Sequence, residues 1–267
     1  MAGRRTTESG FGALLRDARK ARGVSQLTLA LDADVSARHL SFLETGRAEP
    51  SREMVLRLAE ALDLPLRERN LWLTGAGFAS IYTETSLDAP EMATLRRVLF
   101  GMIDRYDPYP ALLIDRGWNV VHANAALGRT FARFVGTDPV WTAQPLNLVH
   151  LTLHPGGLRP WLVNWDDVAA YTLLRLSREA ALASESDELA ALLEAARGYP
   201  DLPPARPTVP EGPVLPLHLK RDDLELRLFS TVTTVGSPGD ITLEDLRIEA
   251  FVPADDASEA ALHALAE

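Results

Sequence analysis

The chain has 267 residues, of which 46% are hydrophobic and 24% charged, and its formal net charge at pH 7 is −10. This composition is typical of a globular protein and argues against wholesale disorder, and no apolar run is long enough to span a membrane. The absence of cysteine excludes disulfide bonds, thiolate catalysis and cysteine-ligated metal centres. The N-terminal stretch MAGRRTTESG lacks the apolar segment of a signal peptide, so we expect a cytoplasmic protein, and the length predicts about two domains.

The charge is distributed unevenly along the chain. Residues 1–80 contain 12 Lys and Arg against 10 Asp and Glu, whereas the remainder contains 15 against 27. The excess of basic side chains is strongest in residues 1–24, which hold six basic and two acidic residues. Such asymmetry indicates a nucleic-acid-binding part within an otherwise acidic protein.

Apolar periodicity and helix caps predict five short helices in residues 1–80. The first starts near Phe11, from which apolar residues recur at i, i+3, i+4 and i+7. The second and third begin at the N-caps Ser25 and Ser36. The fourth and fifth follow at 51–62 and 66–73.

Two short helices joined by a tight turn place the second of them in the major groove of DNA. Residues 24–62, VSQLTLALDADVSARHLSFLETGRAEPSREMVLRLAEAL, resemble the phage-repressor-type helix-turn-helix of XRE-family transcriptional regulators. The matching features are Ser25-Gln26, Leu29-Ala30, Asp34-Val35-Ser36, Leu40, Leu43-Glu44, Gly46-Arg47 and Pro50. Asp34 stands where the family often has glycine, and aspartate tolerates the left-handed conformation of that turn.

The resemblance implies the DNA contacts by position. Gln26 and Arg47 would contact phosphates, and Arg38 is suited to guanine because its guanidinium can donate two parallel hydrogen bonds. The residues expected at the DNA are Gln26, Ser36, Ala37, Arg38, His39, Ser41 and Arg47. Phe42 is expected to be structural. The alternative is a helical bundle with a solvated, charged face.

A polar stretch at 80–89 predicts a linker between a DNA-binding domain at 1–80 and a second domain at 90–260. The second domain alternates strand and helix patterns. Helices are expected at 92–102, 125–134 (capped by Asn124), 147–155, 161–176 and 189–193, and strands at 111–114, 120–123, 215–219, 224–235 and 246–252, with an extended connection at 198–216. We therefore expect a multidomain protein: a five-helix domain, then an α+β domain in which helices cover one side of an antiparallel sheet.

The order of these elements resembles a PAS-like fold. Three segments, at 106–127, 147–167 and 226–255, are similar to the ligand-binding domain of MmyB-like transcription regulators. Together with the helix-turn-helix, the resemblance covers nearly the whole chain. It implies a regulator whose second domain encloses an apolar pocket for a small molecule, such as a fatty acid.

The candidates for the lining of that pocket are mostly large apolar side chains. They are Trp118, Phe131, Phe134, Leu148, Leu151, His154, Trp161, Trp165 and Arg175. His154 or Arg175 could meet a carboxylate, because a buried anion requires a paired donor. A salt bridge to one of the acidic neighbours is the alternative role of Arg175.

Other histidine roles were weighed. His150 and His154 are four residues apart, a spacing that can hold a metal ion, and His122, His150 or His154 could ligate haem in a PAS-like pocket. No third ligand or catalytic motif accompanies them, so we expect no enzyme, no metal and no cofactor beyond a small apolar ligand. The expected partner is a double-stranded DNA operator bound by a homodimer. The alternative is a haem or small-molecule sensor that acts through protein–protein contacts.

Overall fold

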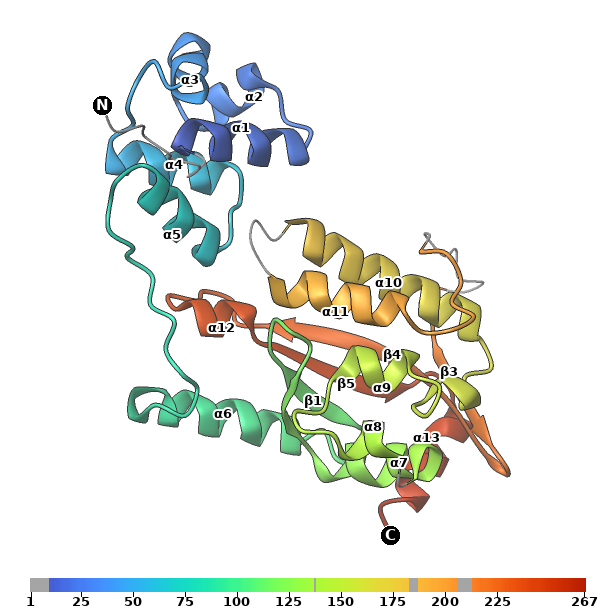
Figure 1. The fold of residues 1–267 in the computed structure, drawn as a ribbon. Coiled ribbons are helices and arrows are strands. Elements are labelled where there is room, and N and C mark those ends of the chain that lie inside the picture. Colours follow the sequence, from blue (N-terminus) through green and yellow to red (C-terminus); the bar gives the residue numbers. More distant parts are fainter. Residues whose placement is uncertain (1–9, 137, 183–186, 206–212) are drawn as a thin grey trace, which may run out of the picture. The chain divides into compact units, whose positions relative to one another are not determined.

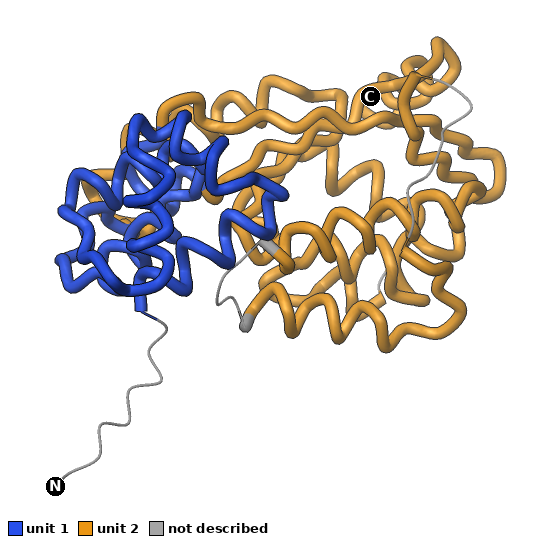
Figure 2. The backbone as a smooth tube through the Cα atoms, turned by 90° about the horizontal axis from the view of Figure 1, so that it is seen from above, with its two compact units in different colours: residues 1–84, 238–244 blue, residues 85–237, 245–267 orange. Residues whose placement is uncertain are grey.

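A computed structural model describes residues 10–136, 138–182, 187–205 and 213–267 (Figure 1). The chain forms two compact units, one of residues 1–84 with 238–244 and the other of residues 85–237 with 245–267 (Figure 2). The basic residues Arg4 and Arg5, and the middle of the proline-rich connection at 198–216, lie outside the described residues. Among the described helices, none combines the length and the apolar character needed to cross a bilayer.

The first unit contains the five helices predicted from the sequence. They are α1 (Phe11–Ala21), α2 (Gln26–Asp32), α3 (Ala37–Glu44), α4 (Arg52–Ala61) and α5 (Leu66–Gly75). Their apolar faces meet in one core, in which Leu15, Leu29 and Leu40 have no exposed surface. The periodicity of the sequence therefore predicted which faces are buried.

Helix caps and a left-handed turn define the boundaries of α2 and α3. The hydroxyls of Ser25 and Ser36 accept hydrogen bonds from the third following amide, at 3.0 and 3.1 Å. Asp34, in the turn between the two helices, has a φ of 52°, so aspartate does adopt the left-handed conformation there. Both predictions about this motif are confirmed.

Residues 238–244, from the connection between two strands of the second unit, belong to the first unit. The Glu244 carboxylate accepts a hydrogen bond of 2.7 Å from the amide of Leu66, the first residue of α5. The helix begins after Pro65, which has no capping side chain, so Glu244 supplies the cap. Thr83 Oγ1 also donates to Asp240 at 2.7 Å, which fixes the same connection beside the end of the helical unit.

The second unit is built on an antiparallel sheet, whose described strands follow the order β2-β1-β5-β4-β3. The strands are β1 (Ala111–Ile114), β2 (Val120–Ala123), β3 (Leu217–Arg221), β4 (Leu224–Thr234) and β5 (Arg247–Pro253). All pairings within this sheet are antiparallel. The PAS-like antiparallel architecture expected from the sequence is thus the observed one.

Helices connect and cover these strands. They are η1 (Pro90–Met92), α6 (Ala93–Asp104), α7 (Ala125–Val135), α8 (Pro139–Thr142), α9 (Leu148–Leu153), η2 (Arg159–Trp161), α10 (Trp165–Leu182), α11 (Asp187–Arg197), α12 (Ile241–Asp245) and α13 (Asp256–Ala264). The helix predicted to start at Trp161 starts at Trp165 instead. Trp161 ends a 3₁₀ turn, and Leu162 is extended and forms a bridge to Leu219, which interrupts the helical path.

The expectation that helices cover only one side of the sheet is wrong. Directly paired residues share a face, so Leu112 and Glu249 lie on one side, and Leu113 and His122 lie on the other. His122 stacks on Phe100 of α6 with a ring separation of 4.0 Å. Helix α6 therefore covers the β1 and β2 part of the face opposite to Glu249, so helices lie on both sides of the sheet (Figure 1).

Candidate functional site

Helix α3 presents a polar outer face because Leu40 and Leu43 occupy its inner face and are buried. Arg38 and the cap Ser36 are exposed, and Arg47, after the helix, is also exposed. The other residues predicted to contact bases are partly exposed: Ala37, His39 and Ser41. This face can therefore reach a groove of DNA without a rearrangement of the core.

Arg38 lies one helical turn from Phe42, and its guanidinium carbon is 5.3 Å from the centre of the ring. The cation–π contact orients the arginine while leaving its donor groups toward solvent. Phe42 is partly buried and lies against this side chain rather than in the apolar core of the unit, so its structural role stays a prediction.

A buried ion pair connects α1 to α3 beneath this face. Arg19 donates to both carboxylate oxygens of Glu44, at 2.6 and 3.1 Å, and also to the carbonyl of Val24 at 2.8 Å. Gln26 Nε2, at the start of α2, donates to Glu44 at 2.7 Å. Gln26, the residue predicted to contact a phosphate, thus has its side-chain amide bonded to Glu44 within the protein. Sequence reasoning missed this pair, since its members are 25 residues apart.

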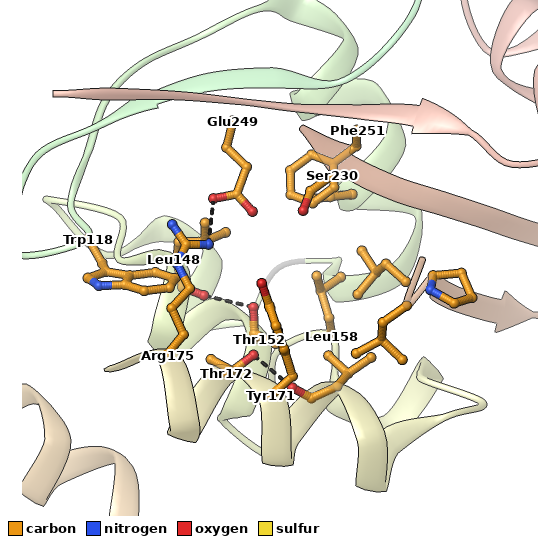
Figure 3. Close-up of a pocket in the computed structure, with 15 residues that line it drawn as sticks. Trp118, Leu148, Thr152, Leu158, Tyr171, Thr172, Arg175, Ser230, Glu249 and Phe251 are labelled. Atoms are coloured by element: carbon orange, nitrogen blue, oxygen red, sulfur yellow. Dashed lines mark hydrogen bonds and ion pairs between the residues drawn. The ribbon is translucent and has the colours of Figure 1, made fainter. Parts of the chain in front are cut away.

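A cavity of about 80 Å³ opens between the sheet and helices α7, α9 and α10 of the second unit (Figure 3). Its lining is mainly apolar, with polar side chains from both the sheet and the helices (Figure 3). The lining residues are Trp118, Phe131, Leu148, Thr152, Leu158, Val168, Tyr171, Thr172, Arg175, Leu215, Pro216, Leu217, Ser230, Glu249 and Phe251. Tyr171 and Ser230 are exposed, so the opening lies on their side.

Four of the residues predicted for a ligand pocket line this cavity: Trp118, Phe131, Leu148 and Arg175. Five others do not. Phe134 and Leu151 are packed in the core, and Trp161 and Trp165 lie beneath Arg221 and Arg159, at 4.5 and 4.7 Å. His154 lines a more open cleft of about 550 Å³, with Asp138, His150 and Tyr199.

Trp118 occupies an unusual backbone position at the wall of the cavity. Its φ is 63°, a conformation that is costly for a bulky residue, although the preceding Gly117 would adopt it freely. Trp118 is 3% exposed, and its indole Nε1 donates to Glu179 at 2.8 Å. Backbone strain held in place by such contacts is characteristic of functional sites.

Four charged side chains form a connected network around the Trp118 ring. Arg175 donates to Glu249 and to Glu179, both at 3.3 Å, and Arg247 donates to Glu179 at 2.6 Å. The guanidinium of Arg175 lies 4.2 Å from the indole centre. Arg175 therefore forms salt bridges, the alternative role foreseen for it, and also lines the cavity.

Sequence reasoning missed most of the polar lining. Glu249 is only 5% exposed and lies within the apolar run of β5, and a charged residue in such a strand was the available signal. Thr152 and Thr172 gave no signal, because threonine is common in buried helical positions that bond to their own backbone.

The histidines considered for metal or haem lie away from this cavity. His150 Nδ1 is 2.7 Å from the hydroxyl of Tyr199, and His154 accepts a hydrogen bond of 3.0 Å from the amide of Gly156. Burial, and then the neighbouring His154, lower the pKa of His150. Within the described residues, no three metal-binding side chains come together.

Comparison with known families matches both units. The family model for the MmyB-like transcription regulator ligand binding domain matches residues 93–265, and a helix-turn-helix model matches residues 15–69. A search of curated proteins gave no match.

Two solved structures show partial similarity. The restriction-modification controller protein C.AhdI from Aeromonas hydrophila is 39% identical over 22% of this chain and 89% of its own length, with a TM-score of 0.21. An RNA-binding light-oxygen-voltage receptor is 15% identical over 97% of this chain and 64% of its own length, with a TM-score of 0.26.

Proposed function

Because the chain belongs to the family of MmyB-like transcription regulators, we propose that it is a homodimeric, cytoplasmic regulator whose affinity for its operator changes when a small, mainly apolar molecule enters the cavity. The helix-turn-helix and the ligand-binding domain make it a DNA-binding transcription regulator. The finer statements, on the bases read, the dimer and the ligand, are argued below.

The observation that supports specific DNA reading is the exposed outer face of α3. Arg38 projects from the first turn of a helix whose start is fixed by the Ser36 cap. Residues at the start of a recognition helix are those that reach base edges in the major groove. Arg38 would read a guanine, and Arg47 would contact a phosphate beside it.

A dimer follows from the size of the reading surface. One helix-turn-helix contacts only a short half-site, so specificity requires two copies about one turn of DNA apart. A ligand would change operator affinity by favouring one arrangement of the two DNA-binding units. The size of that change is limited to the difference in ligand affinity between the two arrangements.

For the ligand, the lining supports a molecule that is mainly apolar with one polar end. The cavity of about 80 Å³ is far smaller than the roughly 300–1,000 Å³ of pockets that enclose a drug-sized molecule. It can hold one end of a ligand whose remainder extends through the opening. The family resemblance suggests a fatty acid, but Arg175 is already paired with Glu179 and Glu249, so the nature of the polar end is argued separately below.

Substitution of Arg38 by alanine tests the recognition surface. We expect Arg38→Ala to weaken binding to the protein's own promoter fragment by about 1–3 kcal/mol, because a bidentate contact to guanine is lost. Gel shifts at several salt concentrations measure this. The matched control is Arg57→Ala, on α4, where the arginine pairs with Glu53 instead. Wild-type affinity in a folded Arg38→Ala protein would contradict the assignment.

A further inference from the structure

We propose that the cavity selects a neutral, mostly apolar ligand that donates a hydrogen bond, from a hydroxyl or an N–H group, to Glu249. The inference rests on the proposed function and names the chemistry of its ligand. Three observations carry it: the bonding state of Glu249, the bonding of two threonines, and the balance of charge around Trp118 (Figure 3).

Glu249 is a buried acceptor with unused capacity. Its carboxylate lines the cavity, is 5% exposed as a residue, and receives one hydrogen bond from the described residues, that of 3.3 Å from Arg175. An ionised carboxylate has about four acceptor positions, so this single long bond leaves several directed elsewhere. A buried carboxylate is stabilised by additional donors, and the cavity is where a ligand can supply one.

Thr152 and Thr172 also present acceptors to the cavity. Each hydroxyl donates its proton to the carbonyl four residues earlier, Leu148 or Val168, at 2.8 Å. A hydroxyl that has donated its one proton can only accept from a ligand. Both threonines are 8% exposed, so the inner polar wall offers lone pairs, whereas the exposed Tyr171 and Ser230 hydroxyls lie toward the opening.

The charges at this wall are already balanced. Arg175 and Arg247 carry two positive charges, and Glu179 and Glu249 carry two negative ones. A carboxylate ligand would add an anion beside Glu249, and an ammonium would add a cation beside Arg175. Either would leave an uncompensated charge in a partly buried site, which is costly. A neutral donor satisfies the acceptors and keeps the balance.

Three probes of equal length separate these possibilities. Octan-1-ol, octanoate and octylammonium differ only at the polar end, and isothermal titration calorimetry on the full chain measures the binding of each. We expect octan-1-ol to bind at least about tenfold more tightly than octanoate, because like charges placed side by side at a binding site cost several kcal/mol. We also expect it to bind more tightly than octylammonium.

A pair of glutamate substitutions localises the preference. Glu249→Gln removes the negative charge and keeps the shape, so octanoate should gain affinity and overtake octan-1-ol. Glu225→Gln is the matched control, since Glu225 lies on β4 outside the cavity, paired with Lys220. It should preserve the wild-type order. If Glu249→Gln does not fold, Thr172→Val removes one acceptor with little change of shape and should weaken octan-1-ol.

The outcomes distinguish this inference from the proposed function. Octanoate or octylammonium binding as tightly as octan-1-ol would overturn the ligand class, and so would a failure of all three to bind. Operator binding, measured in parallel by gel shift, tests the regulator itself. If octan-1-ol binds in the expected order but leaves operator affinity unchanged, the ligand class stands and ligand control of DNA binding fails.

Discussion

Glu44 ends α3, and its carboxylate is bonded to side chains from α1 and α2. Burial alone would raise the pKa of this carboxyl, but the hydrogen bonds from Arg19 and Gln26 outweigh it and hold the pKa below its usual range. The same hydrogen bond from Arg19 to Glu44 raises the pKa of the arginine. The three helices of the reading motif are thereby joined at one residue.

Removal of this charge should destabilise the DNA-binding unit strongly. Glu44→Gln leaves the Arg19 guanidinium buried without a counter-ion, for which a loss of about 3 kcal/mol is expected. Urea-induced unfolding monitored by circular dichroism measures it. Glu53→Gln, at an exposed site paired with Arg57, is the control and should cost well under 1 kcal/mol by comparison. Equal stability of the two variants would contradict the role given to the buried pair.

The pH dependence has a defined sign. Because folding lowers the pKa of Glu44, its contribution is complete above the unfolded value of about 4.3 and is lost as the pH falls toward and below the folded value. Thermal unfolding between neutral and acidic pH should therefore show a fall in stability below about pH 4 that is smaller in Glu44→Gln. If Glu44→Gln loses as much stability at acidic pH as the wild type, the acid dependence comes from other carboxyl groups and the role given to Glu44 is contradicted.

The types of amino acid along the sequence predicted only part of the cavity lining. Trp118, Phe131, Leu148 and Arg175 were foreseen because large apolar and charged residues stand out in the second domain. The partners Glu249 and Thr172 were not, since each reaches the cavity through strand register or helix phase. An ion pair between residues far apart in the sequence produces no periodic pattern, so it cannot be predicted from the spacing of residues.

At the scale of elements, local rules predicted the helical unit well. These rules concern serine caps, an aspartate in the left-handed conformation and the 3.6-residue period of a helix. Each involves residues only a few positions apart, so it can be recognised in the sequence. Beyond α1 to α5, the helices α8, α12 and α13 were not predicted, and α12 lies almost entirely in the first unit's segment 238–244. The first two are four and five residues long, too short for a period to show, while α13 follows the side-chain cap Asp255, a signal that was overlooked.

The caps of α3 and α4 allow a matched test of which helix reads DNA. Ser36→Ala and Ser51→Ala each remove a hydroxyl that accepts from the third following amide, so each should cost about 1 kcal/mol of stability. Only Ser36→Ala should also weaken operator binding, as it loosens the start of α3 and removes a hydroxyl expected at the DNA. Measurement combines unfolding curves with gel shifts. If Ser51→Ala loses as much operator affinity as Ser36→Ala, the loss reflects reduced stability, and the assignment of α3 as the helix that contacts DNA bases is not supported by this test.

At the scale of the whole molecule, contacts between residues far apart in the sequence hold the segment 238–244 in place, and the sequence did not predict them. Residues 238–244 lie between β4 and β5, and β4 and β5 carry the cavity residues Ser230, Glu249 and Phe251. The same short segment holds the cap of α5 and the partner of Thr83. Sequence patterns suggested only a turn there, because its contacts are with residues more than 150 positions away.

This connection should carry the effect of the ligand to the DNA-binding unit. Thr83→Val removes the hydrogen bond to Asp240 and should reduce the ligand-dependent change in operator affinity by about fivefold, the equivalent of roughly 1 kcal/mol. Ligand affinity without DNA should stay unchanged. The control is Thr233→Val, an exposed position on β4. Fluorescence anisotropy of a labelled operator with and without octan-1-ol measures both, and an undiminished response in Thr83→Val would exclude this route.

The cap that Glu244 places on α5 also limits how the two units of this protein can be separated by cutting the chain. The chain passes between its two units after residues 84, 237 and 244, so no single cut separates them. A hybrid regulator made by joining residues 1–84 to a foreign sensor would carry an α5 whose first amide has lost its acceptor. We therefore expect that the DNA-binding unit can be exchanged between such proteins, by gene fusion or in the laboratory, most readily when residues 238–244 are transferred together with the five helices.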